Sequence, residues 1–160
     1  MKRKKKNFNI YFFAECSIVY FLFCYYFKNL VLGLETLDIS LGNKAVSFVH
    51  LKNTGAAFSL FKDLNIFLAV FSLCISVFII AYVIKNRRTL RSLDINACAF
   101  LLAGILSNMA ERFIDGYVTD YIQLNFINFP VFNCADIFIN VGVGLLILSI
   151  LCTKARLKSE

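Results

Sequence analysis

The chain has 160 residues, of which 59% are hydrophobic and 17% are charged. Typical soluble domains are about 45–50% apolar and about 25% charged, so this composition argues against a water-soluble core, a disordered tail and a disulfide scaffold. The formal net charge of +7 is compatible with nucleic-acid binding. However, the basic residues flank long apolar runs, which is typical of membrane proteins, and we expect no nucleic-acid partner.

Four apolar stretches are long enough to form transmembrane helices. At a rise of 1.5 Å per residue, about 20 residues cross the hydrocarbon layer of a bilayer. We expect helices over about residues 8–27, 65–84, 95–111 and 131–152. The third stretch is apolar only as far as Met109 and extends into its polar flank.

The first stretch follows the basic run 2–6, a combination that also occurs in cleavable signal peptides. Phe8–Phe27 is long and lacks a small-x-small cleavage site before a soluble domain, so we expect a retained anchor. Its Glu15 is costly in lipid. It is expected either to be buried against another helix or to reach toward the cytoplasmic side.

Residues 36–62, between the first two helices, have features of β structure. Residues 36–41 alternate polar and apolar, Gly42-Asn43 supplies a turn, and residues 45–51 are largely β-prone. This predicts a small hairpin that includes His50 and lies at the outer membrane surface. The expected fold is therefore an all-α membrane protein of one domain, residues 1–160, with four transmembrane helices and this extracytoplasmic β-hairpin.

The distribution of Lys and Arg predicts the orientation in the membrane. Most of these 17 residues lie in the N-terminal run, in the segment 85–91 and in the tail from Lys154. Positive residues are held on the cytoplasmic side. We therefore expect both termini and the 85–91 loop to be cytoplasmic, and residues 28–64 and 110–130 to face outward.

The cysteines and the single histidine form no recognisable motif for metal binding or nucleophilic catalysis. The cysteines lie in or beside apolar runs without CxxC or Cys/His spacing, so we expect small buried hydrophobic residues: Cys16, Cys24, Cys74, Cys98, Cys134 and Cys152. His50 has no Ser or Cys placed to act with it, and no His/Glu set fits a metal ion.

Polar residues gather where the third helix ends and the fourth begins. They are Asn108, Glu111, Arg112, Asp115, Asp120, Asn133, Asp136 and Asn140. Polar groups at membrane depth are expensive, so this concentration indicates a site toward the outer face. Asp115 is expected to be a solvated loop charge.

Asp136 has two interpretations. It forms an i, i+3 pair with Asn133 inside an apolar run, where a carboxylate needs a partner. It is either a functional carboxylate or a helix N-terminal one, stabilised by the dipole and free N–H groups with Asn133 as the cap.

Asp120 lies in a short extended run rather than at a loop tip. If this segment folds over the fourth helix, Asp120 and Asp136 face each other, and two close carboxylates cannot both ionise cheaply. One acid and one base then coexist, which suits water attack on an amide. Asn53, Asn108 and Arg112 either position a peptide backbone and these carboxylates, or join the helices.

Three separated motifs together resemble the lipoprotein signal peptidase family, also called signal peptidase II. Residues 53–59, NTGAAFS, look like its N-x-G-A-A-F-S motif. Residues 107–112, SNMAER, followed by Gly116-x-Val118-x-Asp120, resemble its G-N-x-x-D-R…G-x-V-x-D block. Residues 129–136, FPVFNCAD, match its F-P-x-F-N-x-A-D motif.

The resemblance implies an intramembrane aspartyl endopeptidase of the bacterial cytoplasmic (inner) membrane, with its active site toward the outer face. The family removes signal peptides from prolipoproteins by cutting before a diacylglyceryl-modified cysteine. Asp120 and Asp136 fall on its catalytic positions. Its positions that support the dyad and the substrate correspond to Asn53, Gly55, Asn108, Arg112 and Asn133. The family also implies no metal or organic cofactor, and we expect a monomer surrounded by membrane lipid.

Three positions depart from the family pattern. The first helix of the family usually ends in D-Q-x-x-K, whereas this chain has Cys24 and keeps Lys28. Glu111 replaces an Asp, and Ser107 replaces a Gly where close packing is expected. These changes bear on substrate positioning and leave the dyad intact.

Two other functions suit a small four-helix membrane protein: a proton or ion carrier and a non-catalytic assembly protein. A proton relay needs ionisable residues at several depths, whereas here they cluster outward apart from Glu15. Replacement of Asp120 or Asp136 would indicate an inactive protein, and neither is replaced.

Overall fold

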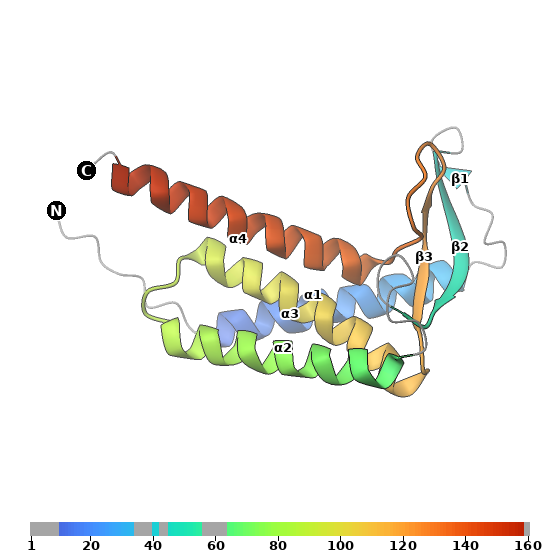
Figure 1. The fold of residues 1–160 in the computed structure, drawn as a ribbon, viewed down its shortest axis with the longest axis horizontal. Coiled ribbons are helices and arrows are strands. Elements are labelled where there is room, and N and C mark those ends of the chain that lie inside the picture. Colours follow the sequence, from blue (N-terminus) through green and yellow to red (C-terminus); the bar gives the residue numbers. More distant parts are fainter. Residues whose placement is uncertain (1–9, 34–39, 42–44, 56–63, 159–160) are drawn as a thin grey trace.

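The computed structural model describes residues 10–33, 40–41, 45–55 and 64–158. Helices make up most of this part of the chain: α1 (Ile10–Leu32), α2 (Asn65–Asn86), α3 (Ser92–Ile114) and α4 (Cys134–Lys158). They run alongside one another, and a small sheet crosses one end of the bundle (Figure 1). All of them are long and apolar enough to cross a membrane.

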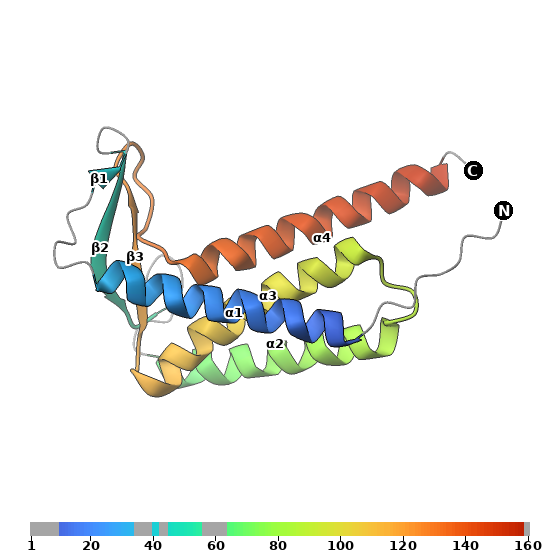
Figure 2. The same cartoon turned by 180° about the vertical axis from the view of Figure 1, so that it is seen from behind.

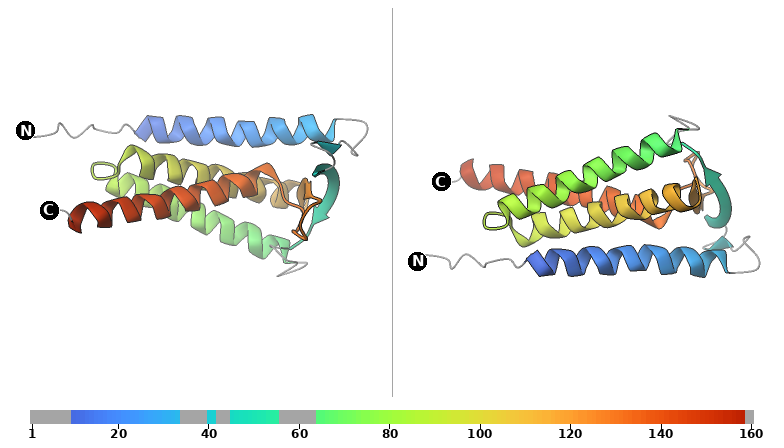
Figure 3. Two further views of the ribbon diagram at one scale, coloured as in Figure 1. Left: turned by 90° about the horizontal axis from the view of Figure 1, so that it is seen from above. Right: turned by 90° about the horizontal axis from the view of Figure 1, so that it is seen from below.

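Helix α3 is the central helix of the bundle. It contacts α1, α2 and α4, and α1 and α2 lie on opposite sides of it (Figure 3). Outward-facing positions of the surrounding helices carry large apolar side chains such as Leu30, Ile66 and Phe78. Apolar side chains on the outside of a bundle are stable in lipid and unfavourable in water.

The buried side chains form two clusters. The first joins α1, α2 and α3 around Phe13, Val83 and Ile95. The second lies nearer the sheet and joins α1 and α4 to the strand that precedes α4, through Cys24, Tyr121 and Cys134 among others. The first part of α1 and the last part of α4 lie at the opposite end of the bundle (Figure 2).

Gly104 lets α3 and α4 approach closely. A Cβ atom at this position would lie 2.5 Å from the carbonyl oxygen of Ala135 and 2.8 Å from Cγ1 of Ile139. Such distances leave no room for a side chain. The first turn of α4 therefore rests directly on the backbone of α3.

The sheet has three antiparallel strands among the described residues, β1 (Ser40–Leu41), β2 (Val46–Asn53) and β3 (Val118–Leu124), in the order β1-β2-β3. Strands β1 and β2 confirm the predicted hairpin. Strand β3 comes from the connection between α3 and α4, and only its extended conformation was expected. Gly116, with φ of +78°, makes the turn into β3, a backbone conformation that glycine adopts without strain.

A polar network joins α3 to α4 at the end opposite the sheet. The carboxylate of Asp94 accepts a hydrogen bond from the backbone N–H of Arg91 at 2.8 Å and forms an ion pair with its guanidinium at 3.3 Å. The guanidinium also donates to the carbonyl oxygen of Ser149 at 2.7 Å. The buried Ser149 hydroxyl contacts both Asp94 and Arg91. This network fixes the far end of α4 on the start of α3.

Some expectations need correction. Cys74 and Cys152 are exposed, because these positions face outward from the bundle, and Cys16 is only partly buried at the edge of the first cluster. Glu15 is exposed on α1 rather than buried against another helix. Helix α4 begins at Cys134, because the backbone of Phe132 is bonded to Ile122 of β3 instead. The basic run 2–6, the hairpin residues 36–39 and 42–44, and motif residues 56–59 lie outside the described residues.

Candidate active site

Asp120 is a buried carboxylate on β3, with only 2% of its surface exposed. Its Oδ2 accepts a hydrogen bond from Nδ2 of Asn53 at 2.8 Å, and its Oδ1 accepts one from Nδ2 of Asn133 at 2.9 Å. The antiparallel pairing of β2 with β3, in which Leu51 lies opposite Asp120, brings Asn53 close to this carboxylate. Two neutral amide groups therefore supply hydrogen-bond donors to the two oxygens of the Asp120 carboxylate.

Asp136 lies in the first turn of α4 and forms a reciprocal cap with Asn133. Its Oδ2 accepts the backbone N–H of Asn133 at 3.0 Å, and its own N–H donates to Oδ1 of Asn133 at 3.0 Å. Its Oδ1 accepts Nδ2 of Asn108 at 2.9 Å. The carboxylate thus has the capping geometry that its spacing predicted, and it also faces a residue of α3.

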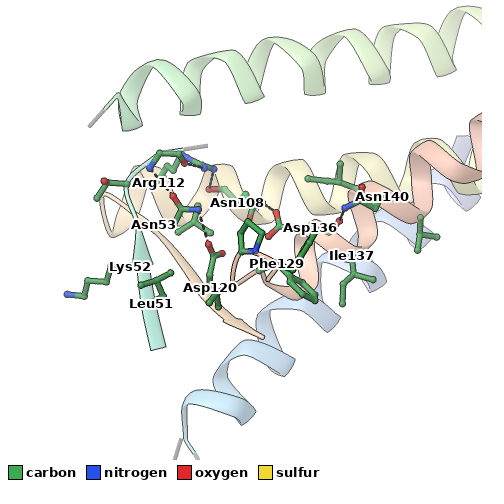
Figure 4. Close-up of a pocket in the computed structure, with 18 residues that line it drawn as sticks. Leu51, Lys52, Asn53, Asn108, Arg112, Asp120, Phe129, Asp136, Ile137 and Asn140 are labelled. Atoms are coloured by element: carbon green, nitrogen blue, oxygen red, sulfur yellow. Dashed lines mark hydrogen bonds between the residues drawn. The ribbon is translucent and has the colours of Figure 1, made fainter. Parts of the chain in front are cut away.

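Asn133 links the two carboxylates. Its Nδ2 donates to Asp120 and also to Oδ1 of Asn108 at 3.1 Å, while Asn108 donates to Asp136. Figure 4 shows Asp120 and Asp136 in one pocket, with Asn53 and Asn108 beside them. Amide side chains from β2, α3 and the start of α4 therefore hold both carboxylates in place.

The surroundings of Asp120 favour its neutral form. Burial, reinforced by the negative charge of Asp136, raises its pKa to about 6, although the hydrogen bonds from Asn53 and Asn133 act in the opposite direction. A carboxyl group of this kind can hold a proton near neutral pH. This is the property expected of one member of an acid and base pair.

Arg112, in the last turn of α3, ties the end of β2 to the site. Its Nη2 donates to the carbonyl oxygen of Gly55 at 2.9 Å, and its Nη1 donates to that of Asn108 at 3.3 Å. Gly55 is buried, and its own N–H donates to Oδ1 of Asn53 at 2.9 Å. The guanidinium therefore fixes the segment that carries Asn53.

A second set of contacts, which the sequence did not predict, holds β3 from the other side. Oε2 of Glu111 accepts the backbone N–H of Thr119 at 2.8 Å, and its Oε1 pairs with Nζ of Lys28 at 3.5 Å. The available signal in the sequence was that Lys28 and Glu111 carry opposite charges near the ends of their helices. The contacts connect α1 and α3 to the residue that precedes Asp120.

Tyr121 was also missed by the sequence interpretation. Its side chain is 1% exposed, and its hydroxyl oxygen accepts the backbone N–H of Cys134 at 3.1 Å. Burial raises the pKa of this hydroxyl, so it stays protonated. The residue after Asp120 therefore contacts the start of the helix that carries Asp136.

The carboxylates open into a cleft of about 1040 Å³. Its polar lining includes Asn53, Asn108 and Arg112, and its apolar lining includes Phe129, Ile137 and Val141. The structure thus brings every predicted site residue together: Asn53, Gly55, Asn108, Arg112, Asp120, Asn133 and Asp136. Asp115 is exposed, as expected for a solvated loop charge. In the described ranges, no three His, Cys, Asp or Glu side chains are grouped to hold a metal ion.

Comparison with known proteins identifies the family. A model of signal peptidase II matches residues 16–152. The chain belongs to the signal peptidase II family. A lipoprotein signal peptidase of Enterococcus faecalis is 38% identical over 139 residues, which are 79% of this chain and 83% of the relative. One of Microcystis aeruginosa is 40% identical over 109 residues, 68% of this chain and 70% of the relative.

Solved structures share the fold of this signal peptidase II family member. One bacterial membrane enzyme superposes with a TM-score of 0.85 at 23% identity, covering 96% of each chain. Another has a TM-score of 0.79 at 24% identity and covers 93% of this chain and 98% of the other. Together with the four apolar helices in the described part of the chain, membership in this family fits a multi-pass peptidase of the bacterial inner membrane rather than a carrier or an assembly protein.

Proposed function

We propose that this protein is an aspartyl peptidase in which Asp120 and Asp136 are the catalytic pair. The observation that carries the proposal is their arrangement: both carboxylates line one cleft and are joined through Asn133 and Asn108. Its substrate is a prolipoprotein, the class named by its relatives. Cleavage falls before the diacylglyceryl-modified cysteine.

The reaction uses one proton shared by the pair. The ionised carboxylate takes a proton from a water molecule, and the resulting hydroxide attacks the carbonyl carbon of the scissile amide. The protonated carboxyl donates a hydrogen bond to the developing oxyanion. The C–N bond then breaks as a proton passes to the leaving amine, which becomes the new N-terminus. Because the two groups titrate together, the protonation states belong to the pair.

The supporting residues hold this geometry. Asn53, Asn108 and Asn133 orient the carboxylate oxygens with neutral donors, which leaves a proton free to move between the acids. Arg112 fixes the segment around Gly55, and its positive charge lies close enough to act on both carboxylates. Positioning of this kind supplies much of the catalytic power of a preorganised site.

The cleft suits a substrate that enters from the membrane. Its apolar wall from α4 includes Ile137 and Val141, whose side chains are exposed on the bundle and can contact a signal-peptide helix and acyl chains. In the proposed orientation, both termini are cytoplasmic and the sheet lies at the outer surface, where water is available. We further propose that residues 1–160 act as one domain and as a monomer.

The decisive experiment is cleavage of a diacylglyceryl-modified prolipoprotein peptide by the purified protein in detergent. Asp120→Asn and Asp136→Asn are each expected to lower kcat by about 10²–10⁴-fold, the usual contribution of a general acid or base. Asp115→Asn, at an exposed carboxylate outside the cleft, is the matched control. Full activity in either dyad variant, with thermal unfolding unchanged, would refute the assignment.

A further inference from the structure

A second groove of the bundle lies between α1 and α2, away from the proposed catalytic cleft. Its volume is about 440 Å³, within the range of about 300–1,000 Å³ that is typical of ligand sites. Helices α1 and α2 converge toward the end opposite the sheet, with α3 between them (Figure 3). Side chains from all three helices line the groove, among them Ala14, Ile18, Ile80, Ile84, Leu102 and Leu106.

The groove is suited to a hydrocarbon chain. The hydroxyl of Ser17, the polar side chain among its described lining residues, donates to the carbonyl oxygen of Phe13 at 2.8 Å and is therefore already bonded. A polar ligand would lose its hydrogen bonds to water here without replacing them. The exposed Ile18 and Ile84 leave the groove open to the lipid around the bundle.

Two arginines lie at the end of the groove. Arg87 and Arg88 follow Ile84 by three and four residues, the spacing that places side chains on one helical face. Helical geometry continues into this pair, because Arg87 has φ of −51° and ψ of −25° and the N–H of Leu90 donates to the carbonyl oxygen of Asn86 at 3.0 Å. The arginines therefore extend the groove-lining face of α2.

The two guanidinium groups can bind an anion. Both arginines are exposed, and the ion pairs within the described residues engage other basic side chains, Lys28 and Arg91. Glu15 is exposed on α1, but it does not line the groove. Because guanidinium groups bind phosphate oxygens through paired hydrogen bonds, this end of the groove is complementary to a phosphate group.

We propose that the groove binds one anionic phospholipid, with an acyl chain between α1 and α2 and the phosphate on Arg87 and Arg88. A phospholipid supplies both features, whereas free phosphate lacks the chain. In the proposed orientation this end of the bundle is cytoplasmic, where anionic lipids give the membrane surface a negative potential. The site does not depend on the proposed peptidase reaction.

The positive-inside rule explains why basic residues gather at this end, but it does not specify which helical face they occupy. Lys85 has the same charge and adjoins Ile84, yet one residue along a helix turns the side chain by about 100°. Lys85 therefore lies on a different face of α2 from the arginines. It separates the effect of position from that of charge.

The test measures lipid retention by native mass spectrometry. The purified protein in detergent is incubated with equal amounts of phosphatidylglycerol and phosphatidylcholine that carry the same acyl chains. We expect one phosphatidylglycerol to be retained about tenfold more than phosphatidylcholine, since hydrogen bonds to charged groups are strong. Arg87→Gln/Arg88→Gln should abolish this preference. Lys85→Gln/Lys154→Gln, which removes two exposed charges from the same end of the bundle, should keep it.

A second pair of variants tests the acyl-chain part of the site. Ala14→Trp fills the groove and should lower phosphatidylglycerol retention about tenfold, whereas Val19→Trp, at an exposed position of α1 outside the groove, should leave it unchanged. Thermal unfolding in lipid-free detergent shows that each variant is folded.

Several results would overturn the site. Equal retention of the two lipids would show that the arginines do not select a charge, and an equal loss in the lysine variant would reduce the effect to charge alone. Phosphatidylglycerol retained by both the arginine variant and Ala14→Trp would place the lipid elsewhere, such as in the catalytic cleft. Dimers abolished by Ala14→Trp would identify a second copy of the chain as the occupant. Because no readout is cleavage, failure of the proposed function would leave these results intact.

Discussion

The two ends of the α3–α4 pair each contain a polar network, and the networks differ in which groups bind their carboxylates. At the end opposite the sheet, Asp94 is paired with the guanidinium of Arg91. At the sheet end, the described hydrogen-bond partners of Asp120 and Asp136 are amides and backbone N–H groups. A guanidinium that is hydrogen-bonded to a carboxylate cancels its charge, whereas an amide orients the carboxylate without cancelling it. At the sheet end, the described hydrogen bonds of the Arg112 guanidinium go to backbone carbonyl oxygens.

Under the proposed function, this difference separates a structural network from the one that carries out the reaction. The Asp94 network joins two helices and has its charges paired. The Asp120 and Asp136 network joins the same two helices and the sheet, and opens into a cleft of about 1040 Å³. Four further substitutions test whether this distinction holds.

Asn133→Ala should have the largest effect, because it removes the donor to Asp120 and the cap of α4. We expect kcat/KM to fall about 100-fold, since the carboxylates lose their alignment. Loss of the cap should also lower the free energy of unfolding by about 1 kcal/mol. Peptide cleavage and thermal unfolding in detergent measure the two effects.

The control is Ser149→Ala in the Asp94 network, which should lower stability and leave cleavage unchanged. Equal losses of activity in the two variants would erase the distinction.

Asn53→Ala should change the pH dependence of cleavage. Burial raises the pKa of Asp120 to about 6, and the hydrogen bond from Asn53 opposes that rise by stabilising the anion. If Asp120 must be protonated, activity falls as the pH rises through its pKa. Removing the Asn53 amide favours the neutral form of Asp120, so the decline of activity should move to higher pH, with a lower maximal rate.

Asn140→Ala, which changes the cleft without contacting Asp120, is the control. A shift to lower pH would contradict the assignment.

Tyr121→Phe should have a smaller effect, because it removes one hydroxyl and keeps the ring. The N–H of Cys134 loses its acceptor, so we expect a loss of about 1 kcal/mol in the free energy of unfolding. Cleavage should fall only a few-fold. Tyr117→Phe, which removes a hydroxyl from the turn before β3, is the control. If both variants unfold at the wild-type temperature, Tyr121 does not hold α4 in place.

Asp94→Asn should have the smallest effect on cleavage. The ion pair with Arg91 and part of the cap of α3 are lost, and we expect about 1 kcal/mol of stability to be lost with them. Cleavage measured below the unfolding temperature should stay within about twofold of wild type, because rigid helices transmit little of a local change. A loss comparable to that of Asp136→Asn would place Asp94 in the reactive group.

The helices could be predicted from the sequence because a span needs only length and low polarity. The boundaries were less accurate. Helix α3, for example, continues past its expected end at residue 111 through Arg112, whose side chain is stabilised by tertiary contacts. Strand β3 could not be predicted as a partner of β2. Its pairing joins segments far apart in the chain, and no local pattern specifies that register.

The residues of the site could be predicted from the sequence, but the hydrogen bonds that connect them could not. The motifs named the carboxylates, the asparagines and Arg112, and the structure brings all of them together. The pairing of Asn53 with Asp120 depends on strand register, and the contacts of Glu111 and Tyr121 depend on backbone atoms. Such partners are set by three-dimensional position, which residue types alone do not encode.

Because Gly104 has no side chain, α3 and α4 lie close together beside the proposed catalytic centre. Asn108 lies one helical turn after Gly104 on α3. A Cβ atom at position 104 would clash with the carbonyl oxygen of Ala135, the residue before Asp136. A larger side chain at position 104 would therefore push the first turn of α4 away from α3, and with it Asp136 away from the amide of Asn108. A substitution at Gly104 meant to stabilise the bundle would therefore also change the space in which the scissile peptide bond of the proposed substrate must fit.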